Sequence, residues 1–421
     1  AAAIAGWGSP LPDPPPAPRA ALGAAGLWLR HLGGPGGEAP AAPDAGTPPA
    51  GEWRAAWISY IELQGMDYTS AEAFRAGAAA MMDRCAGLGL NTVIVQVRPF
   101  GDALYPSALF PWSHICTGVQ GVSPGFDPLD ILLTEAHSRG LSFEGWINPY
   151  RLQASASSPG TLAADNLANT HPDWVAAAGG GLYLNPAIPE AAAYVVEGVA
   201  ELVRTYPVDG VHFDDYFYPT TDPAIDAARF AASGAADLAE WRRQNVTALV
   251  KAAHDAVKAA DPTLRFGVSP QGNPDNDMSQ QYSDVRGWLA AGSEDAVVDY
   301  LCPQLYWGYG YTLSNGSRRF AYENILAEWL AMPRGSAALY VGLGAYRIGE
   351  GDGGANGDSV SGWSTGRALA DQVGTLRAAG AGGYALYRYG SLFQNTAWPQ
   401  LAEAECAALT AANAPDGGRA G

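Results

Sequence analysis

The pattern that most constrains the fold is an eightfold alternation of short apolar runs with longer amphipathic segments. The apolar runs are rich in β-branched and aromatic residues, which is typical of buried strands. Strands that alternate with helices in one run predict an α/β protein, a (β/α)8 TIM barrel with long βα loops. The expected strands are residues 54–60, 92–97, 141–147, 210–214, 265–269, 297–306, 338–343 and 383–389.

Helix start signals follow several of these strands. Thr69 with Glu72 has the spacing of a capping box, Asp127 precedes a proline, and Pro189 opens a further helical segment. The expected helices are residues 69–88, 127–140, 189–205, 236–260, 280–291, 318–330, 365–379 and 399–409.

The connecting segments predict where a site would lie. Links from helix to strand are short, for example residues 89–91, whereas links from strand to helix are long. The extra chain therefore gathers at the carboxyl ends of the strands, where barrel enzymes place their active sites. The long links are residues 98–126, 148–189, 215–235 and 344–364.

The two ends of the chain differ from the rest in composition. Residues 1–50 carry 11 of the 31 prolines and are otherwise rich in Ala and Gly, so we expect a disordered leader or tether. Residues 51–412 form the expected barrel, and 413–421 an expected loose tail. The chain does not begin with Met, so we expect a processed or truncated end, which leaves open a signal peptide or lipid anchor upstream.

Charge and motif content exclude several classes of protein. The formal net charge of −18 and the lack of a basic stripe argue against a nucleic-acid partner. No apolar run is long enough to span a membrane. No nucleophile elbow, P-loop or metal-ligand spacing occurs, so we expect neither a metal nor a cofactor. The cysteines form no zinc motif, and the sequence leaves open the disulfide state of Cys85, Cys116, Cys302 and Cys406.

Residues 209–219, DGVHFDDYFYP, place acids at the tip of a buried strand. Because side chains alternate faces along a strand, Val211 and Phe213 share the face that packs under a helix. His212 and Asp214 then share the inward face. Packing does not require acids at such a position, whereas proton transfer on a sugar does. Asp214 is therefore the first candidate for a catalytic acid.

A glycosidase normally needs a second carboxylate, and the sequence offers several. Asp215 falls on the apolar face unless the strand breaks, and Asp102 follows the second strand. Glu144, inside the third strand, is either a buried, paired acid or a third candidate. His212 is either a residue that tunes or orients Asp214 or a satisfied core histidine.

Polar and aromatic residues also follow the other strands. Amide and guanidinium donors beside flat rings suit a polyhydroxylated ligand, although each residue taken singly has an ordinary structural role. Their convergence on one end of a barrel predicts a glycan site. The candidates for substrate binding are Arg98, Trp112, His114, Asn148, Tyr150, His212, Gln304, Tyr306, Trp307 and Tyr346.

Several motifs taken together resemble one bacterial family, the glycosyl-hydrolase-like family 10, over about residues 52–395. Its members are barrel proteins, often secreted or lipid-anchored, and include a division-site enzyme that cuts peptidoglycan glycan stripped of its stem peptides. The motifs are EWR at 52–54, QVRPFGDALY at 96–105, PWSH at 111–114, WINPYR at 146–151, the segment 209–219, CPQLYW at 302–307 and GAYR at 344–347.

The resemblance implies an extracytoplasmic envelope glycosidase in which Asp214 and Asp215 form the acidic centre and Asp102 is a site residue. The fourth strand is also similar to a chitinase-type pattern, but it has Tyr216 where that pattern ends in Glu, so the chitinase mechanism is not carried over. We therefore expect a secreted, periplasmic or surface-anchored hydrolase of peptidoglycan-like glycan. The alternatives are a glycosidase for another polysaccharide and a non-catalytic glycan-binding barrel.

Overall fold

The structure, a computed structural model, describes residues 48–156, 158–357 and 359–414. All of them belong to one unit of the chain, which begins at residue 42. The expected leader therefore lies outside the described residues except for positions 48–50, and so does the expected tail from residue 415 onward.

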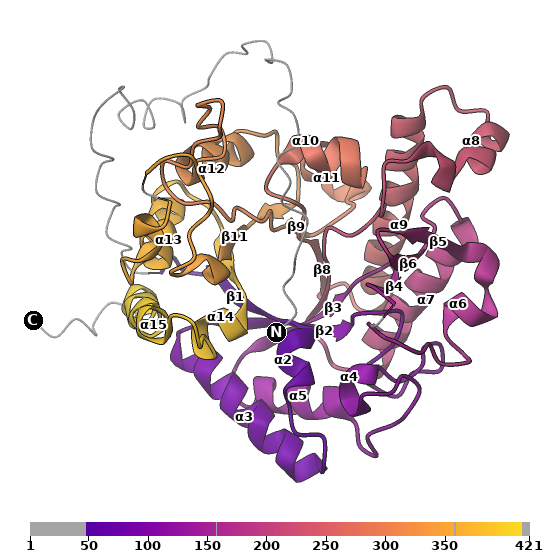
Figure 1. The fold of residues 1–421 in the computed structure, drawn as a ribbon, viewed down its shortest axis with the longest axis horizontal. Coiled ribbons are helices and arrows are strands. Elements are labelled where there is room, and N and C mark those ends of the chain that lie inside the picture. Colours follow the sequence, from indigo (N-terminus) through magenta and orange to yellow (C-terminus); the bar gives the residue numbers. More distant parts are fainter. Residues whose placement is uncertain (1–47, 157, 358, 415–421) are drawn as a thin grey trace, which may run out of the picture. The chain divides into compact units, whose positions relative to one another are not determined.

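The barrel strands are β1 (Trp53–Ile58), β2 (Thr92–Arg98), β3 (Ser142–Ile147), β7 (Gly210–Phe213), β8 (Arg265–Val268), β9 (Tyr300–Leu301), β10 (Ala338–Leu339), β11 (Val341–Gly344) and β12 (Gly383–Tyr387). They pair in parallel in the order β10-β9-β8-β7-β3-β2-β1-β12-β11. Only Tyr340 separates β10 from β11, so the two are segments of one stave that pairs with β9 on one side and β12 on the other. The nine strands therefore make eight staves, which confirms the predicted (β/α)8 barrel (Figure 1).

The sixth stave is shorter than the predicted strand at 297–306. Only Tyr300 and Leu301 form its regular ladder. Pro303 has no N–H to continue the ladder, and the stave goes on as isolated bridges from Gln304 to its neighbours on both sides.

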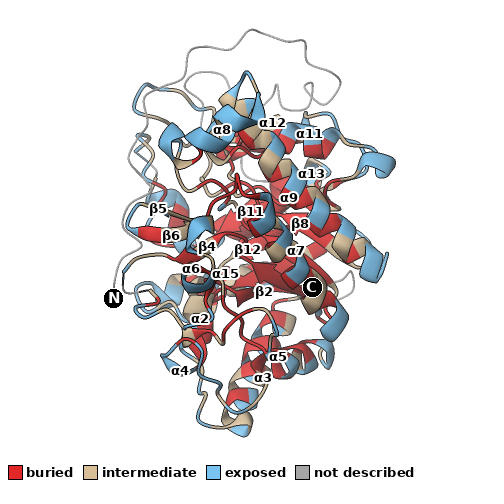
Figure 2. Cartoon of the chain, turned by 90° about the vertical axis from the view of Figure 1, so that its right-hand side faces the viewer, coloured by how far each residue is buried: buried red, intermediate tan, exposed pale blue. Residues whose placement is uncertain are grey.

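Alternation along the strands sorts the side chains into two apolar cores. Outward side chains such as Val211 and Phe213 pack under the helices, whereas inward ones such as Trp57, Trp146 and Tyr300 fill the barrel. The burial colouring in Figure 2 shows buried strands inside helices that are exposed mainly on their outer sides. The predicted faces of the fourth strand are confirmed for Val211 and Phe213.

The longer helices are α3 (Ala71–Gly87), α5 (Pro128–His137), α7 (Pro189–Thr205), α9 (Leu238–Ala260), α12 (Tyr322–Leu330), α13 (Ala368–Ala378) and α15 (Pro399–Asn413). Asp127 caps α5 and Pro189 opens α7, both as predicted. The predicted cap of α3 is wrong by one residue, because the hydroxyl of Ser70, not that of Thr69, accepts the first-turn N–H. The shorter helices are α2 (Tyr60–Gln64), α4 (His114–Thr117), α6 (Leu167–Thr170), α8 (Ala227–Ser233), α10 (Pro274–Asn276), α11 (Val285–Ala290) and α14 (Tyr389–Phe393).

The long loops at the carboxyl ends of the staves contain structure of their own. After β3, the strands β4 (Arg151–Gln153), β6 (Gly181–Leu184) and β5 (Val175–Ala178) form an antiparallel sheet that the sequence did not predict. After β8, a π-helical turn over Asp277–Gln281 precedes α11, so the helix expected at 280–291 is shorter than predicted.

The folded chain extends past the predicted boundary at residue 412. Asn413 is the last residue of α15, and its side chain is buried. Its Oδ1 accepts hydrogen bonds from Arg377 and Tyr384, and its Nδ2 donates to the carbonyl of Leu88. Asn413 therefore belongs to the barrel domain rather than to a loose tail.

A chain of hydrogen bonds runs through the barrel interior. Trp57 Nε1 donates to His212 Nε2 at 3.1 Å, His212 Nδ1 lies 2.7 Å from the Tyr300 hydroxyl, and that hydroxyl donates to Glu144. Because Tyr300 donates to Glu144, its oxygen accepts from His212 Nδ1, which fixes the neutral Nδ1–H tautomer. Burial and the Arg265 cation lower the pKa of His212 to about 3, in agreement with a neutral ring.

Tyr300→Phe should lower the free energy of unfolding by about 1–3 kcal/mol, because it leaves His212 and Glu144 without their shared buried partner. Denaturant unfolding measures this loss. Tyr340→Phe is the matched control, since its hydroxyl accepts from a partly exposed Arg265 and should matter less. Equal losses in the two variants would contradict the importance of the interior chain.

Candidate active site

The strand that carries the acids ends just before them. β7 stops at Phe213, and both following carboxylates bond to groups from other staves. Asp214 accepts from Trp146 of β3, and Asp215 accepts from Gln304 after β9. Strict alternation would place Asp215 on the apolar face, but because the strand has ended, Asp215 instead accepts from Gln304, two staves away.

Asp214 is a buried carboxyl surrounded by donors, with 4% of its surface exposed. Trp146 Nε1 and Asn148 Nδ2 donate to Oδ2 at 3.0 and 3.2 Å, and the Tyr216 N–H donates to Oδ1 at 3.3 Å. Burial and the neighbouring Asp215 charge raise the pKa of Asp214 to about 7, although these donors oppose the rise. The side chain can therefore hold a proton near neutral pH, as a general acid must.

The register between β3 and β7 explains why these donors converge on Asp214. Trp146 lies opposite His212, so both point into the barrel. Two residues further along, Asn148 reaches the carboxyl of Asp214. Asn148 was a predicted site residue, whereas Trp146 was missed, although alternation places Trp146 on the same face as Asn148.

Asp215 is more exposed than Asp214 and has a different environment. Gln304 Nε2 donates to Asp215 Oδ1 at 3.1 Å and to the Ser269 carbonyl at 3.2 Å. Burial raises the pKa of Asp215, and the Gln304 hydrogen bond opposes that rise. Two neighbouring acids in unlike environments can divide into one protonated and one ionised group.

Arg151 places a cation beside the two acids. Its guanidinium carbon lies 4.6 Å from the centroid of the Phe100 ring and 5.5 Å from that of Tyr216. Its positive charge lowers the pKa of both Asp214 and Asp215, against the effect of burial. Arg151 was absent from the predicted site residues, although it closes the WINPYR motif that follows β3.

A buried carboxyl that sequence reasoning missed, Asp277, supports the loop after β8. Its Oδ1 accepts from the Gln271 N–H at 2.9 Å, and the Gln271 backbone forms a bridge with Gln304. Burial raises the pKa of Asp277 well above its ordinary value. Asp277 thereby helps to place the segment from which Gln304 reaches Asp215, and nothing in its local sequence distinguishes it from an ordinary loop acid.

Tyrosine rings cluster near the acids. The ring centroid of Tyr306 lies 5.6 Å from that of Tyr346 and 5.5 Å from that of Tyr387. Tyr346 is 36% exposed and Tyr216 is 45% exposed, so both offer ring surface to a ligand. Tyr306, Tyr346 and the partly buried Trp307 were predicted for substrate binding, whereas Tyr387 was not.

Three residues predicted for substrate binding are buried. Both ring nitrogens of His212 are engaged in the interior chain, and Tyr150 has no exposed surface. Arg98 is also buried, with its guanidinium carbon 3.7 Å from the centroid of the Phe110 ring. The structure places all three side chains in the interior, where His212 is a satisfied core histidine, and their contact with a ligand stays a prediction.

Asp102 is fully buried in the loop after β2. Its Oδ2 accepts from Gln120 Nε2 at 3.0 Å and lies 3.6 Å from His114 Nδ1. These contacts describe a loop anchor and favour Asp215 over Asp102 as the second carboxylate. Trp112 and His114 lie in the same loop and are partly exposed.

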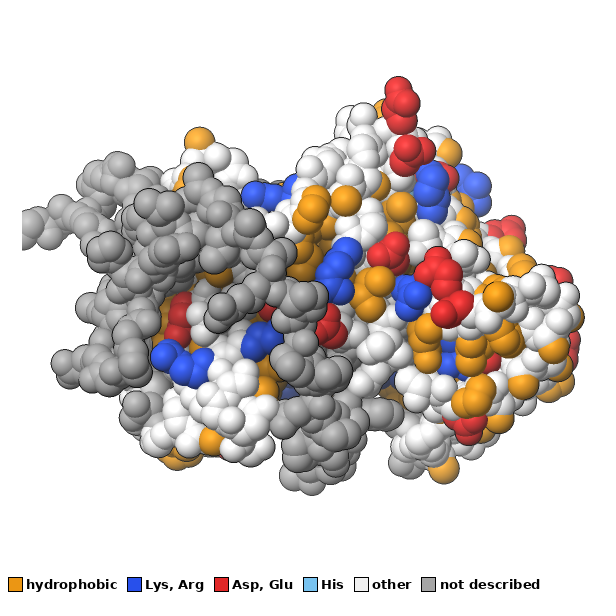
Figure 3. Space-filling view, turned by 90° about the horizontal axis from the view of Figure 1, so that it is seen from above, with side chains coloured by type: hydrophobic (Ala, Val, Ile, Leu, Met, Phe, Trp, Pro, Cys, Tyr) orange, Lys and Arg blue, Asp and Glu red, His pale blue; other side chains and the backbone are white. Residues whose placement is uncertain are grey.

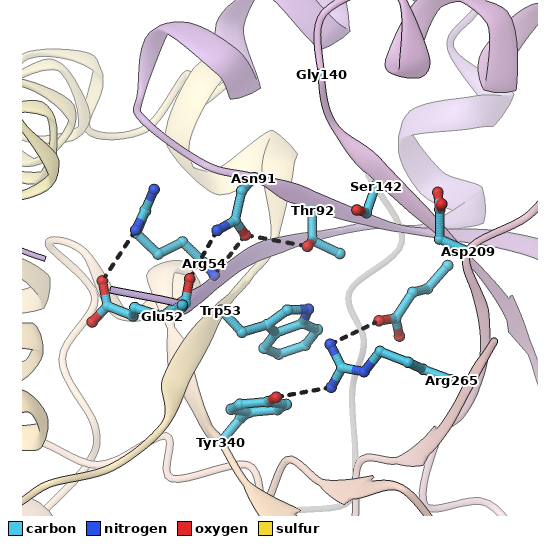
Figure 4. Close-up of a pocket in the computed structure, with 12 residues that line it drawn as sticks. Glu52, Trp53, Arg54, Asn91, Thr92, Gly140, Ser142, Asp209, Arg265 and Tyr340 are labelled. Carbon is cyan, nitrogen blue, oxygen red and sulfur yellow. Dashed lines mark hydrogen bonds and ion pairs between the residues drawn. The ribbon is translucent and has the colours of Figure 1, made fainter. Parts of the chain in front are cut away.

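Glu144 faces the opposite end of the barrel. A pocket of about 390 Å³ opens there at the amino ends of the staves, and Arg265 lies beside Trp53 and reaches Tyr340 in it (Figure 4). Burial raises the pKa of Glu144 to about 7, but its partners are Tyr300 and Arg265, so it is a buried, paired acid. The pocket is lined by Gly51, Glu52, Trp53, Arg54, Asn91, Thr92, Gly140, Ser142, Glu144, Asp209, Arg265 and Tyr340.

The surface charges, the helices, the cysteines and the possible metal ligands can each be described from the structure. On the part of the face that Figure 3 leaves uncovered, basic and acidic side chains lie interspersed rather than in a basic stripe.

No helix in the described ranges is long and apolar enough to cross a membrane. All four cysteines are free thiols. Among the residues that the structure describes, no cluster of His, Cys, Asp and Glu could hold a metal ion.

Paired carboxylates with aromatic neighbours at the carboxyl ends of eight parallel staves define a barrel of the glycoside-hydrolase type. Comparison with known families agrees with this class. Residues 52–355 match the family described as Glycosyl hydrolase-like 10, and the chain belongs to that family. The resemblance inferred from the motifs is thereby confirmed.

Two curated relatives carry glycosidase names. The chain is 38% identical over 323 residues to Glycosyl hydrolase YngK of Bacillus subtilis (strain 168), which covers 70% of this chain and 61% of the relative. It is 36% identical over 299 residues to Glycosyl hydrolase DigH of Escherichia coli (strain K12), which covers 64% of this chain and 65% of the relative. The matched region thus spans less than two thirds of the length of either relative.

A solved structure supports the fold. The glycoside hydrolase domain of PgaB (BpsB) from Bordetella bronchiseptica matches with a TM-score of 0.52 and 15% sequence identity. The match covers 85% of this chain and 99% of that chain. At this level of identity, the likeness shows a shared barrel fold.

Asp214→Asn should stabilise the protein relative to wild type at pH 8 but not at pH 4. The native state keeps a proton on Asp214 up to pH about 7, whereas the unfolded chain loses it near the ordinary value of 3.8. The wild type therefore loses stability as the pH rises through this window, and the Asn variant does not share that loss. Thermal unfolding at several pH values measures the difference, and a gap between the two proteins that stays constant with pH would contradict it.

Proposed function

We propose that this protein is a glycoside hydrolase that cleaves bacterial cell-envelope glycan, namely peptidoglycan strands that lack stem peptides. Its family and the names of its curated relatives support glycoside hydrolysis. The substrate class rests on the motif resemblance, and such a substrate requires an extracytoplasmic protein. The single observation that carries the proposal is the buried carboxyl of Asp214, held by Trp146 and Asn148, beside Asp215.

In the proposed reaction, Asp214 is the general acid. Its proton passes to the glycosidic oxygen as the bond from that oxygen to the anomeric carbon breaks. The leaving sugar departs as an alcohol, and positive charge develops on the ring that remains. Trp146 and Asn148 hold the carboxyl in place and can stabilise the carboxylate that forms after proton transfer.

Asp215 supplies the second carboxylate. Its hydrogen bond from Gln304 and the nearby Arg151 cation favour the ionised form, which suits a base, a nucleophile or a stabiliser of the developing positive charge. A protonated Asp214 next to an ionised Asp215 is the division of roles that the reaction needs.

Exposed tyrosines beside the acids suit a sugar ring. Tyr216 and Tyr346 offer flat apolar surface together with a phenol hydroxyl that can bond to sugar hydroxyls. Neither the proposed bond cleavage nor the sugar binding requires a metal or an organic cofactor.

Asp214→Asn should lower the rate of product release from stem-free peptidoglycan glycan by roughly 100-fold or more, because Asn has no proton to donate. Asp209→Asn is the matched control, since this partly exposed acid lies just before the same strand, at the other end of the barrel, and should retain wild-type activity. Release of reducing ends, followed by mass spectrometry, measures the rates. Full activity of Asp214→Asn would remove this residue from the mechanism.

The same assay on a panel of glycans separates the proposal from its alternatives. Binding of glycan without release of reducing ends would favour a non-catalytic barrel. Release of products from another polysaccharide, but not from stem-free peptidoglycan, would keep the hydrolase and overturn the proposed substrate.

The activity should depend on pH with two limbs. It should fall as pH rises through about 7, where Asp214 loses its proton, and fall in acid, where Asp215 becomes protonated. Gln304→Ala removes a donor that favours the ionised form of Asp215, so the acid limb should move upward by about one pH unit. A kcat/KM profile measures both limbs, and an acid limb that does not move in this variant would contradict the role given to Asp215.

A further inference from the structure

We propose that Trp398 forms a distal sugar-binding subsite that supports an extended glycan strand outside the catalytic centre, an inference that rests on the function proposed above. Trp398 lies in the loop between α14 and α15, after the last stave. This loop belongs to the carboxyl end of the barrel, as do the loops that carry Asp214 and Asp215. Trp398 as a residue is 40% exposed, which is unusual for so large an apolar residue.

One face of the indole is covered and the other is left for a ligand. A Cβ placed on Gly349 would lie 2.3, 2.4 and 2.6 Å from Trp398 Cγ, Cδ2 and Cδ1, so the Gly349 backbone packs over the five-membered ring. Gly349 also has a φ of +72°, a conformation that suits glycine. Since the backbone covers one face, the exposed surface of the ring belongs to its other face and its edge.

The ring is also held at its polar edge and through its backbone. Trp398 Nε1 donates to Glu350 Oε1 at 3.0 Å, and the Trp398 N–H donates to Asn395 Oδ1 at 2.8 Å. Trp398 is the residue before the first turn of α15, and its carbonyl accepts from the Ala402 N–H. A ring fixed in this way loses little conformational entropy when a ligand binds.

Aromatic side chains link this ring to the acids. Gln304, whose side chain donates to Asp215, lies two residues before Tyr306, and the Tyr306 ring contacts the Tyr346 ring. Tyr346 belongs to the helical turn Ala345–Arg347, which leads directly to Gly349 beneath Trp398. Tyr346 therefore lies three residues before the backbone that packs against Trp398.

The chemistry of this surface fits a sugar better than a protein side chain. A flat, one-sided ring accepts the C–H face of a pyranose, and the Glu350 carboxylate beside it can accept hydrogen bonds from hydroxyl groups. The occupant is a further sugar residue of the strand whose glycosidic bond lies at Asp214. Trp398 also lies outside residues 52–355, so it is a feature of this chain beyond the matched family region.

The test compares glycan strands of two lengths. Stem-free peptidoglycan glycan is sorted into tetrasaccharides and strands of more than twelve sugars, and kcat/KM is measured on each. Trp398→Ala should lower kcat/KM on the long strands by about 3–10-fold, the range expected for loss of one stacked ring, and lower it much less on tetrasaccharides. Trp398→Phe should recover part of the loss, because it restores a ring. Val119→Ala, at an exposed apolar residue in the loop after β2, is the control and should leave both values unchanged.

The possible outcomes test the Trp398 subsite and the proposed hydrolase activity separately. Equal losses on both lengths, or no loss on either, in a Trp398→Ala variant with wild-type thermal stability would overturn the subsite while the hydrolase stands. If the wild type cleaves neither length, calorimetric binding of the long strands decides the subsite independently. Binding weakened several-fold by Trp398→Ala would then support the subsite, although the proposed hydrolase activity fails. Unchanged binding would overturn the subsite.

Discussion

The burial of one carboxyl at the end of a barrel stave is the constraint on which the site depends. Moving an ionised carboxylate out of water is costly, and a buried acid avoids the cost by keeping its proton. Asp214 is in this position, enclosed by Trp146 and Asn148 and next to the charge of Asp215. The free energy of unfolding is therefore lower above neutral pH, and the same burial holds a proton donor at a fixed place.

The barrel separates this site from the interactions that stabilise the fold. The interior chain through His212 and Tyr300 ends at Glu144, near the amino ends of the staves, where Arg265 and its pocket lie. The catalytic candidates lie at the carboxyl ends, in loops that carry an additional sheet and a π-helical turn. Loops at one end can therefore vary to suit a ligand, while the layers beneath them keep the barrel closed.

Periodicity predicted the repeating parts of the fold, because alternation and helical spacing are properties of the local sequence. It placed the eight staves and the inward face of Asp214 correctly. It could not predict that β7 ends at Phe213, which lets Asp215 reach Gln304 instead of the apolar face. The convergence of strand ends named Arg98 and Tyr150, but it carries no information on how a side chain at the end of a stave turns, and both are buried. Asp277 had no sequence signal because only the folded loop after β8 brings it near Gln271.

The central claim is that Asp214 holds a proton at neutral pH in the folded protein. Infrared difference spectra of wild type minus Asp214→Asn, recorded during a pH titration, isolate the carbonyl stretch of this one protonated carboxyl. The account predicts that the band persists in mildly acidic solution and disappears with a midpoint near pH 7. A band that disappears near pH 4, the ordinary range of an aspartic acid, would contradict it.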